Sequence, residues 1–262
     1  MYLSKSLLSG IIITATVSTI LVGCDSGNQN NTTQSASDTT SNASASDLQK
    51  VNALSGQEKE EGWELLFNGN STDSWKGYRK EVVPEGWVIN DDALHFTGES
   101  GAGDIITKNE YENFELALEW KIIEGGNSGI FFNVVEDEKY DAVYHTGPEM
   151  QILDDERHPD AKQNPGKRIA GSNYDLYEPS AKARPAGEWN QARLVKNNNK
   201  VEHWMNGEKV VEYELGSDKW KKDVKNSKFV EMPDYGLAQK GHIALQDHGD
   251  KVWFRNIKIR KL

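Results

Sequence analysis

The sequence predicts an all-β protein whose folded part is a single antiparallel β-sandwich. About a dozen short apolar runs, separated by turn signals, recur from Trp63 to the end of the chain. The clearest run alternates apolar and polar residues over positions 114–122, which is typical of a strand with one face in the core. No long amphipathic helix and no second linker interrupts this pattern. Short strands with turns between them are the signature of a sandwich.

The strands expected before residue 135 are short. They are 63–67, 86–89, 93–96, 104–107, 114–122 and 128–135. The second and third bracket Asn90-Asp91-Asp92, which predicts a hairpin. Gly125-Gly126-Asn127 predicts another turn, and Asn127-Ser128-Gly129 is interpreted as part of that hairpin.

A long segment, residues 155–188, breaks the strand pattern with prolines and glycines. A loop of this length inside a compact domain is often functional. Strands resume at 191–195, 200–205, 208–211, 241–246 and 252–259. Asn206-Gly207 predicts a tight type I′ hairpin turn, and residues 217–225 predict one short helix with Ser217 as its cap.

The first 57 residues are expected to lie outside the folded domain, which then spans 58–262. Residues 1–24 combine Lys5 with an apolar run that ends at Cys24, as in a secretory signal peptide. Small residues before this lone cysteine resemble a bacterial lipoprotein cleavage site. That resemblance implies a lipid on Cys24 and a location in the cell envelope, periplasmic or at the surface. The alternative is an unmodified cysteine in a plain signal peptide. Residues 25–57 are polar and predict a disordered tether.

Charge and aromatic content restrict the partners. The formal net charge is -11, with no cluster of Lys and Arg, so nucleic acid is not an expected partner. Eight Trp and nine Tyr residues suit a core, and they also suit flat platforms for sugar rings.

The stretch Gly147 to Asp155 carries the strongest chemical signal. Alternation directs Met150 and Ile152 to the core and Glu149 and Gln151 to the opposite face. A bulge near Leu153 would bring Asp154 to the same polar face. The alternative is an ordinary strand with one wet face.

Four further residues are candidates for the same site. Gln246 and His248 share the polar parity of the penultimate strand, and histidine can transfer protons near neutral pH. Tyr174, in the long loop, could stack on a sugar or pack as part of a lid. Arg255 could contact ligand or pair with an acid.

From about Trp63 onward the chain shows a family resemblance. The domain resembles the bacterial 3-keto-disaccharide hydrolase family, long known only as a domain of unknown function. The motifs that carry the resemblance are GWELLFNG (62–69), NFEL (113–116), NSGI (127–130), EMQILD (149–154), GEWN (187–190), WMNG (204–207), GHIALQDHG (241–249) and VWFRNI (252–257).

The resemblance implies a concanavalin-like jelly roll, shared with bacterial 1,3-β-glucanases. Those enzymes carry two Glu with an Asp between them, on positions that match Glu149, Gln151 and Asp154 here. The changes at the second and third positions argue against simple double displacement, which needs two carboxyl groups about 5 to 5.5 Å apart.

The family name implies a different route. A ketone at C3 acidifies the C2 proton, so a base can remove it and the C1 group can leave, after which water adds. This hypothesis assigns Glu149, His248 and Asp154 as catalytic residues whose roles could permute. Gln151, Gln246, Tyr174 and Arg255 would bind the sugar. No cofactor is required, although a divalent metal between His248 and the acids is possible. A partner oxidoreductase would supply the keto sugar.

Two other functions stay open. One is a carbohydrate-binding module on the same fold, with no catalysis. The other is an ordinary β-glucan hydrolase acting on unoxidised sugars. The pH dependence of turnover, or its absence, separates the module from the enzymes.

Overall fold

The computed structural model describes residues 50–98 and 101–262. The expected signal peptide, Cys24 and most of the expected tether lie outside the described residues. The described residues belong to one compact unit, Ser46–Leu262. Within them, no helix has the length and apolar character that crossing a bilayer would require.

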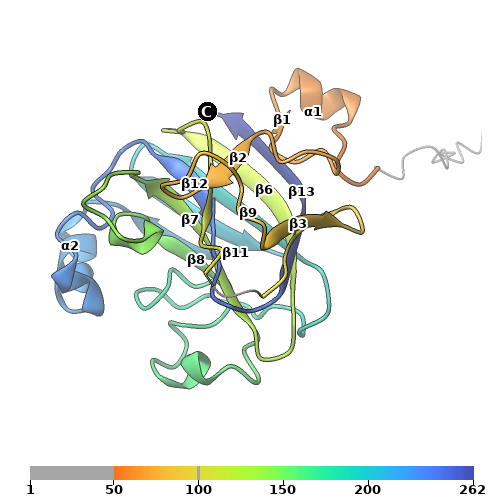
Figure 1. Ribbon diagram of the computed structural model, residues 1–262. Helices are drawn as coiled ribbons and strands as arrows, with labels where there is room; N and C mark the ends of the chain where they lie inside the picture. The colour runs from red at the N-terminus through yellow and green to blue at the C-terminus, as the bar shows by residue number, and fades with distance from the viewer. Residues whose placement is uncertain (1–49, 99–100) are drawn as a thin grey trace, which may run out of the picture. The chain divides into compact units, whose positions relative to one another are not determined.

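The larger of two antiparallel sheets has eight strands among the described residues. They are β1 (Glu64–Leu65), β3 (Trp87–Asn90), β4 (Ala93–Phe96), β6 (Phe114–Ile122), β9 (Asn190–Asn197), β10 (Lys200–Met205), β11 (Glu208–Glu214) and β13 (Val252–Lys261). Their order is β11-β10-β9-β6-β13-β4-β3, and β1 pairs with β13 (Figure 1). Hairpin pairs at the two sides of this sheet are joined through β6 and β13, whose neighbours come from distant parts of the chain, as in a jelly roll.

The smaller sheet has five strands in the described part of the chain. They are β2 (Trp75–Gly77), β5 (Ile105–Thr107), β7 (Asn127–Val134), β8 (Glu149–Leu153) and β12 (His242–Leu245). Their order is β2-β5-β12-β7-β8, and every pairing is antiparallel. The predicted all-β, concanavalin-like jelly roll is confirmed.

Helical segments are short and lie outside the sheets. They are α1 (Gly56–Glu60), α2 (Asp218–Lys225) and the 3₁₀ turns η1 (Val143–His145), η2 (Pro159–Lys162) and η3 (Lys228–Glu231). The predicted cap of α2 is confirmed, because Ser217 Oγ accepts the N–H of Trp220 at 3.1 Å. Both predicted tight turns also form. Asp91, Asp92, Asn206 and Gly207 all have positive φ, which a type I′ turn requires.

The main core lies between the two sheets, and a second apolar cluster lies on the other face of the smaller sheet. In β7, Ile130 and Phe132 belong to the main core, whereas Phe131 belongs to the second cluster. Every residue of β7, β8 and β12 is buried. The smaller sheet is therefore covered on both faces along these three strands, and their polar side chains on the second face are removed from bulk water.

The expected bulge near Leu153 is absent. The pairing of β7 with β8 runs without a shift to the pair Asn127 and Leu153. The next N–H, of Asp154, donates to Gly126 O at 3.0 Å. Asp154 therefore follows a regular strand and keeps the parity that the bulge would have changed.

The folded part begins before residue 58. Asn52 is buried, and its backbone N–H donates to Asn256 Oδ1 at 2.7 Å. Its own side chain accepts the N–H of Asn256 at 2.8 Å and donates to Asp92 O at 2.7 Å. Residues that the sequence assigns to the tether thus bind the middle of β13, where its pairing with β6 shifts register.

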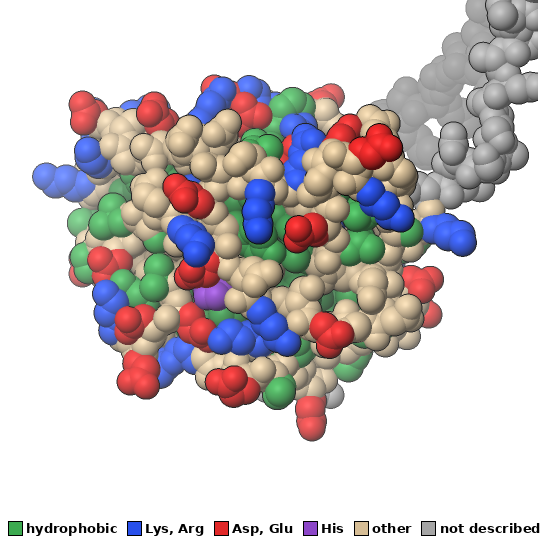
Figure 2. Space-filling view, turned by 90° about the horizontal axis from the view of Figure 1, so that it is seen from above, with side chains coloured by type: hydrophobic (Ala, Val, Ile, Leu, Met, Phe, Trp, Pro, Cys, Tyr) green, Lys and Arg blue, Asp and Glu red, His purple; other side chains and the backbone are tan. Residues whose placement is uncertain are grey.

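The surface seen from above mixes charges of both signs. Figure 2 shows acidic and basic side chains interspersed over this view, with apolar side chains between them. Mixed charges of this kind produce no extended field of one sign on that face.

Replacing Asn52 with alanine should destabilise the domain. Asn52→Ala removes two side-chain hydrogen bonds, leaves the N–H of Asn256 unpaired and puts alanine at a φ of 57°. We expect the free energy of unfolding in urea to fall by about 1–3 kcal/mol. Asn199→Ala, on an exposed turn, is the control and should change it little. Equal effects of the two substitutions would contradict the anchoring role of Asn52.

Candidate active site

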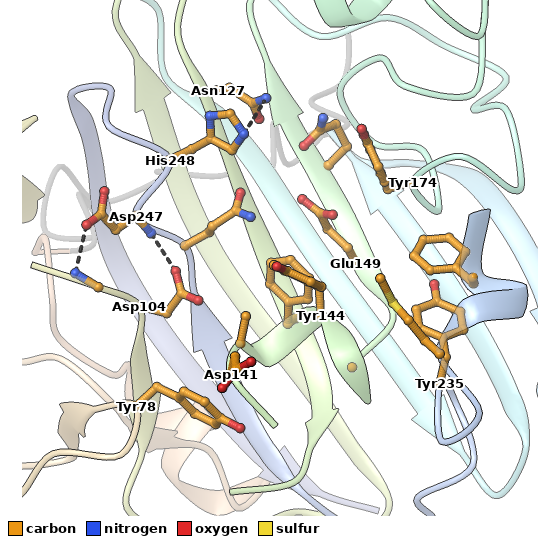
Figure 3. Close-up of a pocket in the computed structure, with 18 of the residues that line it drawn as sticks. Tyr78, Asp104, Asn127, Asp141, Tyr144, Glu149, Tyr174, Tyr235, Asp247 and His248 are labelled. Carbon is orange, nitrogen blue, oxygen red and sulfur yellow. Dashed lines mark hydrogen bonds between the residues drawn. The ribbon is translucent and has the colours of Figure 1, made fainter. Parts of the chain in front are cut away.

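A cavity of about 830 Å³ opens on the second face of the smaller sheet. The five strands contribute to it in their spatial order, mostly through residues at or just beyond strand ends. Its wall includes Tyr78 after β2, Asp104 before β5, Gln246, Asp247 and His248 after β12, Asn127 and Phe131 of β7, and Glu149 and Gln151 of β8. Figure 3 shows Asp104 and Asp247 on one side and Glu149 and Tyr174 on the other.

Glu149 is a buried carboxyl group in this cavity with a raised pKa. Only 7% of the residue is exposed. Burial raises the pKa of Glu149 to about 8, and the nearby acids Asp104 and Asp160 raise it further, against the opposing charge of Lys228. The predicted alternation is confirmed here, because Met150 and Ile152 lie in the main core while Glu149 and Gln151 face the cavity.

Gly129 makes room for Glu149. It pairs with Gln151 across β7 and β8, and a Cβ built on it would meet Glu149 Oε1 at 2.2 Å. The backbone oxygen of Gly129 accepts the N–H of Gln246 at 3.1 Å. A glycine at this place therefore lets a carboxylate lie flat against the sheet.

Asp104 and Asp247 are hydrogen-bonded to each other on the wall of the cavity that faces Glu149. The N–H of Asp247 donates to Asp104 Oδ1 at 2.9 Å, and Asp247 Oδ2 accepts the N–H of Gly103 at 2.7 Å. Burial raises the pKa of Asp104 to about 7, and the Asp247 carboxylate adds to the effect. The cavity thus contains two carboxyl groups that change protonation near neutral pH.

Amides and an imidazole supply further polar groups. Asn127 Nδ2 lies 3.4 Å from His248 Nε2. Among the described residues, the buried oxygens Asn127 Oδ1 and Gln246 Oε1 have no hydrogen-bond partner. Buried oxygens without a partner are costly, and sugar hydroxyls can satisfy them.

The long segment between β8 and β9 completes one wall. It pairs with the free edge of β8, since Gly171 N–H donates to Gln151 O at 2.8 Å and Tyr174 N–H donates to Glu149 O at 3.1 Å. The hydroxyl of Tyr174 donates to Asp160 Oδ2 at 2.8 Å. Tyr174 thus presents its ring to the cavity while its hydroxyl is held from behind.

Two expected site residues lie elsewhere. Asp154 does not line the cavity, and its carboxylate accepts the N–H groups of Gly125 at 2.7 Å and Glu156 at 3.2 Å. Burial alone would raise the pKa of Asp154, but these N–H groups and Arg157 outweigh it and hold the pKa below its ordinary value. Arg255 belongs to the larger sheet, where its Nε donates to Glu119 at 2.6 Å and its guanidinium stacks 4.0 Å from the Trp189 ring centroid.

One group of side chains has the composition of a metal site. His158, His248 and Asp250 offer ligand atoms that lie within 4.8 Å of one another. Two imidazoles and a carboxylate suit divalent transition metals. However, Nδ1 of His158 accepts the N–H of Asp160 at 3.1 Å, which places the proton of the neutral ring on Nε2. His158 could bind a metal through Nε2 only after its ring turned.

Comparison with known proteins identifies the family. The 3-keto-alpha-glucoside-1,2-lyase-like domain matches residues 62–260. The chain belongs to this family. A protein of Bacteroides thetaiotaomicron named 3-keto-disaccharide hydrolase is 36% identical over 230 residues, which are 77% of this chain and 79% of that protein.

Two solved structures from Parabacteroides distasonis, each described as a candidate glycosyl hydrolase, also match. The first is 38% identical, with a TM-score of 0.76, over 81% of this chain and 100% of that one. The second is 30% identical, with a TM-score of 0.60, over 76% and 99%. The predicted family and the predicted enzyme class, a hydrolase, are thereby confirmed, and the relatives support glycoside hydrolase activity.

Sequence reasoning missed Asp104, Asp247, Asn127 and Lys228, which all line the cavity. Asp247 lies between two residues that were singled out, and the DH pair at its strand end was an available signal. Asp104 precedes a strand of three residues and carries no local pattern. Its position beside Asp247 arises only from the pairing of β5 with β12.

Gly129→Ala should reduce turnover more than it reduces stability. The new Cβ collides with the end of the Glu149 side chain, which can move aside, so the strand can remain paired. We expect kcat to fall by roughly 10- to 100-fold because a carboxylate displaced by about 1 Å is no longer aligned. Steady-state kinetics and thermal unfolding measure the two effects. Unchanged kcat would show that the position of Glu149 does not matter for catalysis.

Proposed function

We propose that this protein cleaves 3-keto-glycosides by removing the C2 proton, eliminating the C1 substituent and adding water. The observation that carries the proposal is the pairing, in one cavity, of a buried Glu149 with a pKa raised to about 8 and an Asp104 with a pKa raised to about 7. The Bacteroides relative carries the name of this substrate class.

Glu149 suits the role of base. A C–H group next to a ketone is a weak acid, so removal of its proton favours a base stronger than an ordinary carboxylate. Burial makes Glu149 such a base, because a desolvated carboxylate holds a proton more tightly. The proton from C2 then resides on Glu149, and the electron pair extends toward the C3 oxygen as an enolate.

The second step needs an acid at the leaving oxygen. Asp104 is held by the N–H of Asp247 through one oxygen, which leaves the other oxygen for a proton. His248, at the end of the same wall, is the second candidate. As the C1–O bond breaks, the enolate collapses to an enone and the acid protonates the departing oxygen. Addition of water to C1 and return of the proton to C2 complete a net hydrolysis.

The arrangement gives less support to ordinary β-glucan hydrolysis. Double displacement would require a second carboxyl group next to Glu149, and the positions that follow it hold Gln151 and an Asp154 occupied by backbone N–H groups. A pure binding module would not need two carboxyl groups with raised pKa values. Gln151, Gln246 and Tyr174 remain the proposed sugar contacts, whereas Arg255 is replaced in that role by Asn127.

We keep two further elements as proposals. Acylation of Cys24 would hold the enzyme at the cell envelope, and an oxidoreductase would have to generate the C3 ketone. Both rest on the resemblances described above and on the chemistry of the substrate.

The first test compares a 3-keto-glucoside with its unoxidised parent. The chain without residues 1–24 is incubated with each, and release of the leaving group is followed. We expect release from the keto sugar alone, and Glu149→Gln should lower that rate by about 10²–10⁴-fold. Release from the parent sugar would support ordinary hydrolysis. Binding by calorimetry without any release would support the carbohydrate-binding module.

The pH profile of kcat/KM tests the two carboxyl groups. The base must be ionised and the acid protonated, although the pKa of Glu149, about 8, lies above the pKa of Asp104, about 7. Only a minor fraction of the enzyme holds this combination at any pH, and that fraction is largest midway between the two values. We expect a bell whose rising limb lies near pH 7 and whose falling limb lies near pH 8. Asp104→Asn should lower the rate and remove the falling limb, and a profile that keeps this limb would transfer the acid role to another group such as His248.

A further inference from the structure

Three cations line the cavity among the described residues, and one of them is unpaired. Arg79 lies 3.6 Å from Asp141 and 3.4 Å from Tyr140 O. Lys80 Nζ donates to Ala102 O at 2.5 Å. The ammonium of Lys228 has no hydrogen bond or ion pair within the described part of the chain, and its Nζ lies 4.1 Å from the centroid of the Tyr174 ring. The ammonium of Lys228 therefore keeps its donors for a ligand.

The aromatic core fixes the position of Lys228. It is the first residue of η3, whose cap Ser227 accepts the N–H of Phe229 at 3.2 Å. Phe229 stacks on Tyr235 with ring centroids 3.9 Å apart, and Tyr235 stacks on Trp220 at 5.9 Å. Tyr235 also lies on the wall in Figure 3. A lysine next to buried, stacked rings is held more rigidly than one on an open loop.

Lys228 and Glu149 each shift the pKa of the other. The charge of Lys228 opposes the upward shift of the Glu149 pKa. Burial lowers the pKa of Lys228, while Glu149 raises it. The two groups form no ion pair within 4.0 Å, and both line the cavity, where a bound substrate could contact them.

We propose that Lys228 is a catalytic residue whose ammonium binds the C3 oxygen of the keto sugar and stabilises the enolate. This inference rests on the proposed function and supplies the group that its first step lacks. Removing the C2 proton transfers that proton to Glu149 and leaves negative charge on the C3 oxygen. A cation at that oxygen stabilises the enolate more than the neutral ketone, which is the requirement for catalysis. Lys228 stays protonated throughout, and no covalent bond to the protein forms.

Lys228 could instead act only through the pKa of Glu149, and the pH dependence separates the two roles. Lys228→Met removes the charge in both cases. The comparison uses exchange of the C2 hydrogen with D₂O, which needs an ionised Glu149 but no acid at the leaving oxygen. A tuning role predicts that the rising limb of exchange moves to higher pH, because the pKa of Glu149 increases, and that the rate recovers fully once Glu149 is ionised. A role at the enolate predicts a loss of about 10²–10³-fold in that rate that persists at every pH. Full recovery at high pH would overturn the inference.

The chain offers a matched control. Lys219 Nζ lies 4.3 Å over the ring of Tyr177 and bonds to Asp223, but Lys219 does not line the cavity. Lys219→Met removes the same kind of cation–ring contact and should leave kcat unchanged. Thermal unfolding of both variants separates folding from catalysis. If both lose activity equally, the inference is wrong.

Two readouts keep this inference apart from the proposed function. Exchange of the C2 hydrogen with D₂O reports enolate formation directly, and Lys228→Met should suppress it as strongly as it suppresses release. Wild-type enzyme that neither exchanges nor releases the keto sugar would overturn the proposed function and this inference together. Normal exchange in Lys228→Met would overturn this inference alone. A borohydride-trapped adduct at Lys228 would overturn the ammonium role and show an imine instead.

Discussion

The removal of Glu149 from water is the constraint on which the rest of the site depends. A carboxylate on a strand normally faces solvent, and a sandwich normally leaves the outer face of each sheet wet. Here the smaller sheet is covered on both faces, with Phe131 and Ala244 in a second apolar cluster beside the cavity. Gly129 then provides the space in which the carboxylate lies.

This placement has a thermodynamic cost that the fold must tolerate. The pKa of Glu149 is about 8 in the folded protein, against an ordinary value of 4.5. Between these values the folded state keeps a proton that the unfolded state has lost, so stability falls as pH rises through this window. The loss is on the order of several kcal/mol by the time the pH exceeds both values. Extensive pairing elsewhere, including the hydrogen bonds of Asn52 to Asn256 in the middle of β13, must offset it.

The parts of the fold and site that could be predicted are those set by local pattern. Alternation assigned the faces of Glu149 and Gln151, and the turn dipeptide assigned the hairpin at Asn206. Asp154 was misplaced because the expected bulge requires an unpaired residue, whereas Leu153 pairs regularly with Asn127. The resemblance to the glucanases therefore predicted the strand that carries Glu149 and Gln151, but it did not predict the position of Asp154.

Non-local pairing explains what the sequence could not show. Asp104 and Asp247 are 143 positions apart in the sequence. The backbone N–H of Asp247 can donate to the Asp104 carboxylate only because β5 and β12 are paired in the sheet. Non-local pairing also explains why Arg255 was wrongly expected at the site. Its motif lies close in sequence to His248, yet β13 crosses to the larger sheet, where Glu119 binds the guanidinium.

The distribution of charge in the cavity favours elimination over substitution. A substitution at C1 needs a carboxylate close to that carbon and in its ionised form, which an ordinary low pKa provides. Here Glu149 and Asp104 have raised pKa values, and the ammonium of Lys228, in η3, lies over the Tyr174 ring in the same cavity. A strong base, a proton donor and a cation together match the demands of a carbon acid, whose negative charge develops on the ketone oxygen rather than at the sugar's anomeric centre. The same burial that costs stability thus creates the basicity that this chemistry needs.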